Sequence, residues 1–373
     1  VYRFPAAIIS VFNVIGIYLL LRILIDRSAA FFGALFIITL PFHLFFARTE
    51  IVVILSIFLT TIILIALFLL LHKRNLVNYI LLGVILGFAS GFHASVRIIA
   101  VLAFLLVVAP DLWEFLKLPG AKEIKQSIIR LFALILFIII GFGPRILFTT
   151  PSIFFHTDQL SFKENLGKGL IEKRDLEATI ENYKKSLMVW FYEPTTSRYP
   201  DHKPILTPPL ALVFLLGIGY SLFVLRKRFL YMVIILAFIV PFTNSAITSW
   251  VNADHRLNPL FPIGSIFVAI GISYTLSKIR EKVVKIVFVV AICSYFLFQL
   301  LTFFVDQPAK KNKNIGDYLS MHIIYFLKST NSFINLSMKT KYDSYSENNN
   351  ICFFVSSANF QTFNFLHYKE QYE

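Results

Sequence analysis

The sequence is poor in charge and in cysteine for its length. Of its 373 residues only 15% are charged, whereas 57% are hydrophobic and phenylalanine alone occurs 41 times. A soluble domain is about 45–50% apolar and about 25% charged. The composition therefore excludes a soluble enzyme and predicts a polytopic membrane protein. The two cysteines, Cys293 and Cys352, are too few for a disulfide scaffold.

The sequence also lacks an initiating methionine and a signal-peptide pattern. It begins at Val1, directly before the first apolar run, and no charged leader with a cleavage site precedes that run. We therefore expect the chain to be a fragment of a longer protein.

Long apolar runs, by contrast, follow one another along most of the chain. About 20 apolar helical residues are needed to cross a hydrocarbon core about 30 Å thick. Continuous runs predict helices, whereas a membrane barrel would show alternation. The sequence predicts ten helices, at 5–25, 29–46, 51–71, 76–92, 97–109, 127–147, 205–225, 229–247, 257–277 and 282–305. The short run 97–109 is expected to begin a few residues earlier, with Arg97 reaching the interface. The predicted fold class is an all-α polytopic membrane protein.

Basic residues concentrate in one set of the short connections between these runs. That set holds fifteen Lys and Arg residues. The opposite set holds five: Arg3, Arg48, Arg97, Arg145 and Arg256. An excess of Lys and Arg marks the cytoplasmic side. Val1 then lies outside, which again predicts a missing upstream helix. The net charge of +14 needs no nucleic-acid partner to explain it.

The polar segments predict four regions along the chain. These are six helices in 1–148, an outer loop 149–204, four helices in 205–305 and an outer tail 306–373. Within the loop, apolar positions from Leu176 to Tyr192 recur at helical spacing. This pattern predicts an interfacial helix with its aromatic end at headgroup level, acting as a lid over a lipid-facing site or as a plain anchor.

The tail reads as the opening of a small α/β domain. Ile351 to Ser356 is typical of a buried strand, residues 315–328 have helical spacing, and Asn359 onward reads as a helix start. One strand with two helices would be marginal alone. We therefore expect truncation at this end as well.

An isolated acid stands among basic residues at the predicted outer helix ends. Glu50 is the only acid between Asp26 and Asp111, and it closely follows Arg48. A charge at membrane depth costs about 2.5–3.5 kcal/mol on insertion scales, so such residues face water, each other or a ligand. Arg48 could simply pair with Glu50 or reach to headgroups.

Five cationic or potentially cationic residues share this predicted side. They are His93, Arg97, Arg145, His255 and Arg256. His93 and Arg97 are four apart and would share a helix face. Arg145 follows Gly141-Phe142-Gly143-Pro144, a predicted helix break. Structural roles, such as helix capping or interfacial anchoring, stay open for each residue. Together they suit an anionic headgroup such as a phosphate, beside a carboxylate that acts as base or metal ligand.

Four motifs, in order, resemble those of a known family. Arg3-Phe4-Pro5 opens a helix, and residues 41–50 read Pro-Phe-His-Leu-Phe-Phe-Ala-Arg-Thr-Glu. Residues 81–89 contain Leu-Gly-x-x-x-Gly-x-Ala, and 254–262 read Asp-His-Arg-Leu-Asn-Pro-Leu-Phe-Pro. The set resembles GT-C type membrane glycosyltransferases, namely the dolichyl-phosphate-mannose protein mannosyltransferases and the lipid A aminoarabinose transferases. Leu257 stands where the family's motif has tyrosine.

The resemblance implies sugar transfer from a polyprenyl- or dolichyl-phosphate donor to an acceptor protein, glycan or lipid at the outer face. It implies an inverting reaction with the lipid phosphate as leaving group. Glu50, with Arg48, would assist catalysis, while Arg256, with His255, His93, Arg97 and Arg145, would bind the lipid phosphate. The family's main catalytic Asp lies upstream of the Arg-x-Pro helix, so we expect this chain to lack it. The resemblance implies no particular cofactor, and a divalent metal at Glu50 stays open.

Two other functions stay open beside the glycosyltransferase. One is a transporter or flippase for a lipid-linked or anionic substrate, although no inverted repeat is visible. The other is a non-catalytic membrane subunit of a glycan pathway. The expected location is a prokaryotic plasma membrane, with loop 149–204 and the tail outside.

Overall fold

The computed structural model describes most of the apolar part of the chain. The described residues are 3–49, 51–92, 94–116, 121–148, 176–195, 203–243, 254–304, 351–355 and 364–368. They fall into two compact units, Val1–Phe304 and Val305–Glu373. The predicted division of the chain into four regions stays a prediction.

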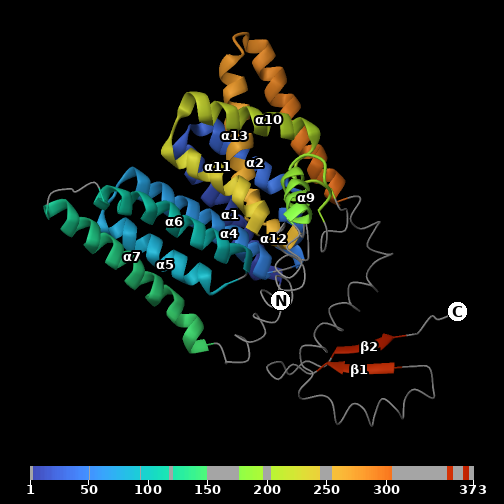
Figure 1. The fold of residues 1–373 in the computed structure, drawn as a ribbon. Coiled ribbons are helices and arrows are strands. Elements are labelled where there is room, and N and C mark those ends of the chain that lie inside the picture. Colours follow the sequence, from blue (N-terminus) through green and yellow to red (C-terminus); the bar gives the residue numbers. More distant parts are fainter. Residues whose placement is uncertain are drawn as a thin grey trace. The chain divides into compact units, whose positions relative to one another are not determined.

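The first unit is built from helices (Figure 1). Their bounds are α1 Arg3–Leu24, α2 Arg27–Thr39, α3 Pro41–Thr49, α4 Ile51–His72, α5 Leu76–Ser90, α6 Ala94–Leu116, α7 Ala121–Phe148, α9 Leu176–Met188, α10 Pro208–Tyr220 with a π-helical turn Ser221–Leu225, α11 Arg228–Pro241, α12 Asp254–Leu257 and α13 Leu260–Lys278. A last helix, Lys282–Phe304, follows α13.

Within the described residues, seven helices are long and apolar enough to cross a membrane. They are Phe4–Leu24, Val52–His72, Ser95–Trp113, Ile124–Pro144, Pro208–Leu225, Leu260–Lys278 and Lys282–Phe304. The bent pair α2 and α3 makes an eighth if it crosses as one span. Two shorter apolar helices, α5 and α11, occupy the remaining predicted runs. The chain is thus an all-α polytopic membrane protein, and the early start of the fifth run is confirmed, because α6 begins at Ala94.

The prediction of one continuous helix over 29–46 is wrong. The chain breaks at Leu40, and α2 and α3 are bent by 57°. Pro41 has no N–H to donate, and its ring disfavours a helical conformation for the preceding residue. Leu40 accordingly has an extended backbone, with φ −65° and ψ 116°.

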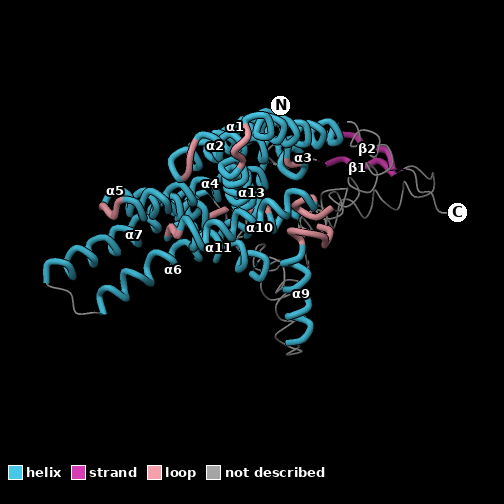
Figure 2. Tube along the Cα trace, turned by 90° about the horizontal axis from the view of Figure 1, so that it is seen from above, coloured by secondary structure: helices cyan, strands magenta, loops and turns pink. Residues whose placement is uncertain are grey.

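The predicted helix break at Gly141–Pro144 is also wrong, because α7 continues through Pro144 to Phe148. Gly141 of α7 allows close packing against α5 instead. A Cβ on Gly141 would lie 2.3 Å from the carbonyl oxygen of Val84, and one on Gly87 would lie 2.1 Å from that of Ile138. Small residues let membrane helices approach backbone to backbone. Figure 1 and Figure 2 both show α5 beside α7.

Most residues of helix α13 are buried, and the helix contacts α1, α2, α4, α10 and α11. Glycine again allows the closest approach: a Cβ on Gly217 of α10 would lie 1.9 Å from the carbonyl oxygen of Phe267, and one on Gly271 would lie 2.0 Å from that of Val213. The last helix, in contrast, is mostly exposed. Its outward apolar surface suits lipid.

Polar contacts between distant segments join helix ends of the same predicted side. Ser273 Oγ donates to Asp26 Oδ2 at 2.9 Å, and both residues belong to the basic set of ends. Ser95 Oγ donates to Asn258 Oδ1 at 3.0 Å, and both belong to the opposite set. Which set faces the cytoplasm stays a prediction.

The described part of the second unit is a two-stranded antiparallel sheet. Strand β1 spans Ile351–Val355 and β2 spans Asn364–Tyr368, with Ile351 opposite Tyr368. The predicted strand at Ile351 is confirmed. The helix predicted from Asn359 onward is wrong over β2, where Phe, Leu, His and Tyr follow Asn364 and aromatic residues favour cross-strand pairing. The helix predicted at 315–328 lies outside the described residues.

Candidate functional site

The first turn of α6 is bonded to the turn between α12 and α13. Ser95 Oγ donates to Asn258 Oδ1 at 3.0 Å, and Asn258 Nδ2 donates to the carbonyl oxygen of His255 at 2.9 Å. Ser95 and Asn258 are both buried. A buried polar group is costly unless it is paired, so this chain of bonds fixes the two segments together. It brings the neighbourhood of Arg97 to the segment that carries His255 and Arg256.

Arg97 is held beside the end of α5. Its Nε donates to the carbonyl oxygen of Phe92 at 2.9 Å, and its side chain is half-buried. The predicted partner on the same face, His93, lies outside the described residues. Arg97 therefore closes the turn between α5 and α6.

Helix α12 carries two of the predicted phosphate-binding residues. His255 is only 5% exposed, and Arg256 is half-buried. Arg256 is thus placed between the protein interior and the surface, where a guanidinium can reach an anion with reduced competition from water.

Helix α3 carries Arg48 at its far end. The Arg48 guanidinium lies over the ring of Phe304, 5.5 Å from its centroid, which is a cation–π arrangement. At the near end of α3, the ring of Phe42 packs against Phe261 of α13 with centroids 5.5 Å apart. Helix α3 thus begins beside the first turn of α13, whereas Glu50, directly after α3, lies outside the described residues.

Arg145 belongs to the last turn of α7, but its side chain lies outside the described part of the structure. The Ser95–Asn258 bond joins the first turn of α6, which carries Arg97, to the turn that follows His255 and Arg256. Arg48 belongs to the last turn of α3. The roles of the seven predicted site residues stay predictions.

The aromatic end of the predicted interfacial helix packs in part against the protein, and its place at headgroup level stays a prediction. The helix α9 ends at Met188, and Trp190 is buried, stacked on Phe214 with centroids 4.7 Å apart. A Cβ on Gly264 would lie 2.9 Å from the Trp190 ring, so that glycine makes room for the indole. Tyr192, in contrast, is 61% exposed.

A buried polar cluster between α1, α3 and α4 was missed by the sequence reasoning. Thr61 Oγ1 donates to Asn13 Oδ1 at 2.6 Å, and Asn13 Nδ2 lies 3.2 Å from His43 Nε2. With the Asn13 oxygen accepting from Thr61, the amide nitrogen donates to His43 Nε2, and the proton of that ring is assigned to Nδ1. An asparagine in the middle of the first apolar run was the signal that could have indicated this cluster.

Possible metal ligands do not gather in the described residues: no group of three or more His, Cys, Asp or Glu side chains could hold an ion there. Glu50, the predicted candidate, is outside that part of the chain. Metal dependence therefore stays an open prediction.

The helices of the first unit are those of a multi-pass membrane protein. Arg48, Arg97, His255 and Arg256 lie at helix ends on the side that the sequence predicts to be the outer one. Residues 1–144 match the family model of the dolichyl-phosphate-mannose-protein mannosyltransferases. The match covers α1 to α6 and most of α7, and it includes three of the four motifs. No curated protein matches the chain. The family match supports a membrane glycosyltransferase of the GT-C type.

Proposed function

We propose that the protein transfers a sugar from a polyprenyl- or dolichyl-phosphate donor to an acceptor at the outer face of the membrane. One observation carries the proposal beyond the family match. The Ser95–Asn258 bond joins a helix inside the matched segment 1–144 to the fourth motif, which lies outside it. The late motif with Arg256 is therefore next to the part of the chain that resembles the family.

The proposed donor site is formed by Arg97, His255 and Arg256. A guanidinium forms paired charge-assisted hydrogen bonds to a phosphate, which suits the lipid phosphate both as a bound group and as a leaving group. In the reaction, the acceptor oxygen bonds to the anomeric carbon and the bond from that carbon to the phosphate oxygen breaks. The acceptor proton passes to a carboxylate, and Glu50 assists there or holds a divalent metal.

The test is release of free polyprenyl phosphate from a radiolabelled polyprenyl-phosphate sugar by the full-length protein in membranes. Replacing a group that takes part in proton transfer costs about 10²–10⁴-fold in rate, so we expect a loss of that order for Glu50→Gln. Arg256→Ala should raise the donor KM more than it lowers kcat. The control is Arg280→Ala, an exposed arginine between α13 and the last helix. Wild-type rates for both site variants would refute the site.

A second candidate function is transport of a lipid-linked or anionic substrate. It is favoured by the 57° break between α2 and α3 and by the buried cluster of Asn13, His43 and Thr61 nearby, since transporters use broken helices to line substrate sites. Liposomes distinguish the two functions. Movement of a labelled lipid-linked sugar between leaflets, without release of lipid phosphate, would favour transport.

A further inference from the structure

The direction of helix α3 is not inherited from the helix before it. Pro41 opens α3, and the chain is bent by 57° between α2 and α3, because proline cannot continue the hydrogen bonds of α2. The last turn of α3 carries Arg48, and Glu50 alone separates α3 from α4 in the chain. Contacts of α3 with other helices therefore set where Arg48 lies, and they set the angle between the two helices that flank Glu50.

His43 holds the first turn of α3 against α1. Its side chain is buried, with 1% of the residue exposed. Its Nε2 lies 3.2 Å from Asn13 Nδ2 and 3.4 Å from Ser10 Oγ. Both partners belong to α1, and both carry a hydrogen that they can donate. With Nε2 as the acceptor, the ring of His43 is neutral and α3 is attached to α1.

The same set of bonds continues to α4. Thr61 Oγ1 donates to Asn13 Oδ1 at 2.6 Å, so one asparagine is bonded to His43 of α3 and to Thr61 of α4. Gly16 of α1 allows this close approach, because a Cβ there would lie 2.9 Å from Cγ2 of Thr61. The buried polar cluster of Asn13, His43 and Thr61 therefore links α3 to α4 through α1.

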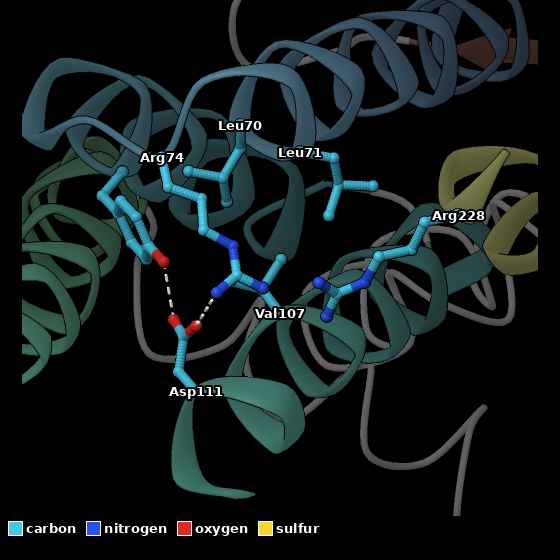
Figure 3. Close-up of a pocket in the computed structure, with 7 residues that line it drawn as sticks. Leu70, Leu71, Arg74, Val107, Asp111 and Arg228 are labelled. Atoms are coloured by element: carbon cyan, nitrogen blue, oxygen red, sulfur yellow. Dashed lines mark hydrogen bonds and ion pairs between the residues drawn. The ribbon is translucent and has the colours of Figure 1, made fainter. Parts of the chain in front are cut away.

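Helix α4, to which the cluster attaches α3, is itself held near its C-terminus. Arg74 follows α4, and its Nη1 lies 3.3 Å from Oδ1 of Asp111 in α6 (Figure 3). One turn before the end of α4, the ring of Phe68 packs edge-on against Phe229 of α11 with centroids 5.4 Å apart. Two other helices thus hold α4, so that loss of the cluster should move α3 rather than α4.

Ring contacts at the two ends of α3 cannot replace the cluster. Phe42 packs against Phe261 at the near end, and the Arg48 guanidinium lies over Phe304 at the far end, each with a separation of 5.5 Å. Aromatic pairs tolerate centroid separations from about 4.5 to 7 Å, whereas a hydrogen bond weakens steeply when its angle is wrong. The bonds of His43 therefore define the orientation of α3 more narrowly than the ring contacts do.

We propose that His43 is a positioning residue for sugar transfer, and that it acts through the orientation of α3 on Arg48 and on the connection that contains Glu50. The inference rests on the proposed function, in which these two residues assist the reaction. In this role His43 contacts neither the donor nor the acceptor. Its acceptor nitrogen keeps α3 in place, and a misplacement of about 1 Å in a reacting group can cost about 10²-fold in rate.

The test measures kcat and the donor KM for release of polyprenyl phosphate from the labelled donor by the full-length protein in membranes. His43→Leu removes the acceptor and should lower kcat about 10- to 100-fold. The donor KM should change little, because the proposed donor site belongs to α6 and α12. His43→Gln puts an acceptor oxygen near the position of Nε2 and should restore most of the rate. The control Thr60→Val removes a buried hydroxyl that donates to Ser56 within α4, and it should behave like wild type.

A double variant separates positioning from a general loss of folded protein. His43→Leu is combined with Glu50→Gln, and each rate is expressed per molecule that binds the donor. If His43 acts through the reacting groups, the two losses overlap, and the double variant is about as slow as Glu50→Gln alone. Asn13→Leu breaks the same bond from α1, and it carries the test if His43→Leu does not accumulate.

Three results would overturn the inference. The first is a wild-type kcat for both His43→Leu and Asn13→Leu. The second is a loss that multiplies with that of Glu50→Gln, as a role in general stability would. The third is a His43→Gln variant as slow as His43→Leu, which would show that the acceptor has no role. A wild-type protein that releases no polyprenyl phosphate would instead refute the proposed function, and the inference with it.

Discussion

Ser95 and Asn258 lie 163 positions apart in the chain, and the hydroxyl of the first donates to the side-chain oxygen of the second at 3.0 Å. The bond is buried and links the start of α6 to the turn that opens α13. Since α13 is mostly buried, this contact fixes the position of α12, with His255 and Arg256, relative to the start of α6. It is the structural basis of the proposed donor site.

Removing that hydroxyl should loosen the site. Ser95→Ala leaves the Asn258 oxygen without this donor, and a buried polar group that loses its partner costs about 1–3 kcal/mol. We expect a lower melting temperature and a higher donor KM. The control is Ser90→Ala, because Ser90 Oγ donates within its own helix, to Leu86. Equal effects of the two variants would show that the bond to α13 has no special role.

Close packing of α5 on α7 depends on the missing side chain of Gly87. A Cβ there would lie 2.1 Å from a backbone oxygen of Ile138, and backbone cannot move aside as a side chain does. Gly87→Ala should therefore separate the helices and cost about 1–3 kcal/mol, as overpacking does. Gly143→Ala is the matched control, since nothing lies within 4 Å of its Cβ position. Thermal unfolding in detergent would measure both, and an unaffected Gly87→Ala would contradict the packing.

The apolar runs predicted where helices form because a membrane span leaves a long, local signal in the sequence. The break at Leu40 was missed, although Pro41 was its local signal, because prolines also lie inside helices such as α7. The burial of Trp190 could not be predicted from the sequence, because it depends on Phe214 and Gly264 in two other helices. The bond of Ser95 to Asn258 could not be predicted either, because no local sequence pattern indicates it. The sequence thus indicates which residues stand at one side, but not which of them meet.

The buried cluster around Asn13 offers a test of cross-helix bonding. Thr61→Val removes the hydroxyl that donates to Asn13 Oδ1 at 2.6 Å with little change in volume. We expect a destabilisation of about 1–3 kcal/mol, because the amide oxygen of Asn13 loses this partner. The neighbouring Thr60→Val is the control, since Thr60, also buried, donates only to Ser56 in its own helix. Melting temperatures that fall equally would argue that the cluster adds nothing beyond intrahelical bonds.

Docking of α9 on α11 should weaken at alkaline pH. The Tyr183 hydroxyl donates to the carbonyl oxygen of Phe238 at 3.2 Å, and its ring packs edge-on against Phe242. Burial raises the pKa of Tyr183 above its ordinary value, which is about 10. When the pKa of a group is higher in the folded state than in the unfolded state, the group's contribution to stability is complete below the unfolded-state pKa. That contribution is lost as the pH rises through the folded-state pKa. The difference in melting temperature between wild type and Tyr183→Phe should therefore be constant from about pH 8 to 9 and shrink above about pH 10.

Tyr192→Phe, which alters an exposed ring, serves as the control. A wild-type advantage over Tyr183→Phe that persists unchanged above pH 10 would show that the hydroxyl does not contribute through its protonated form.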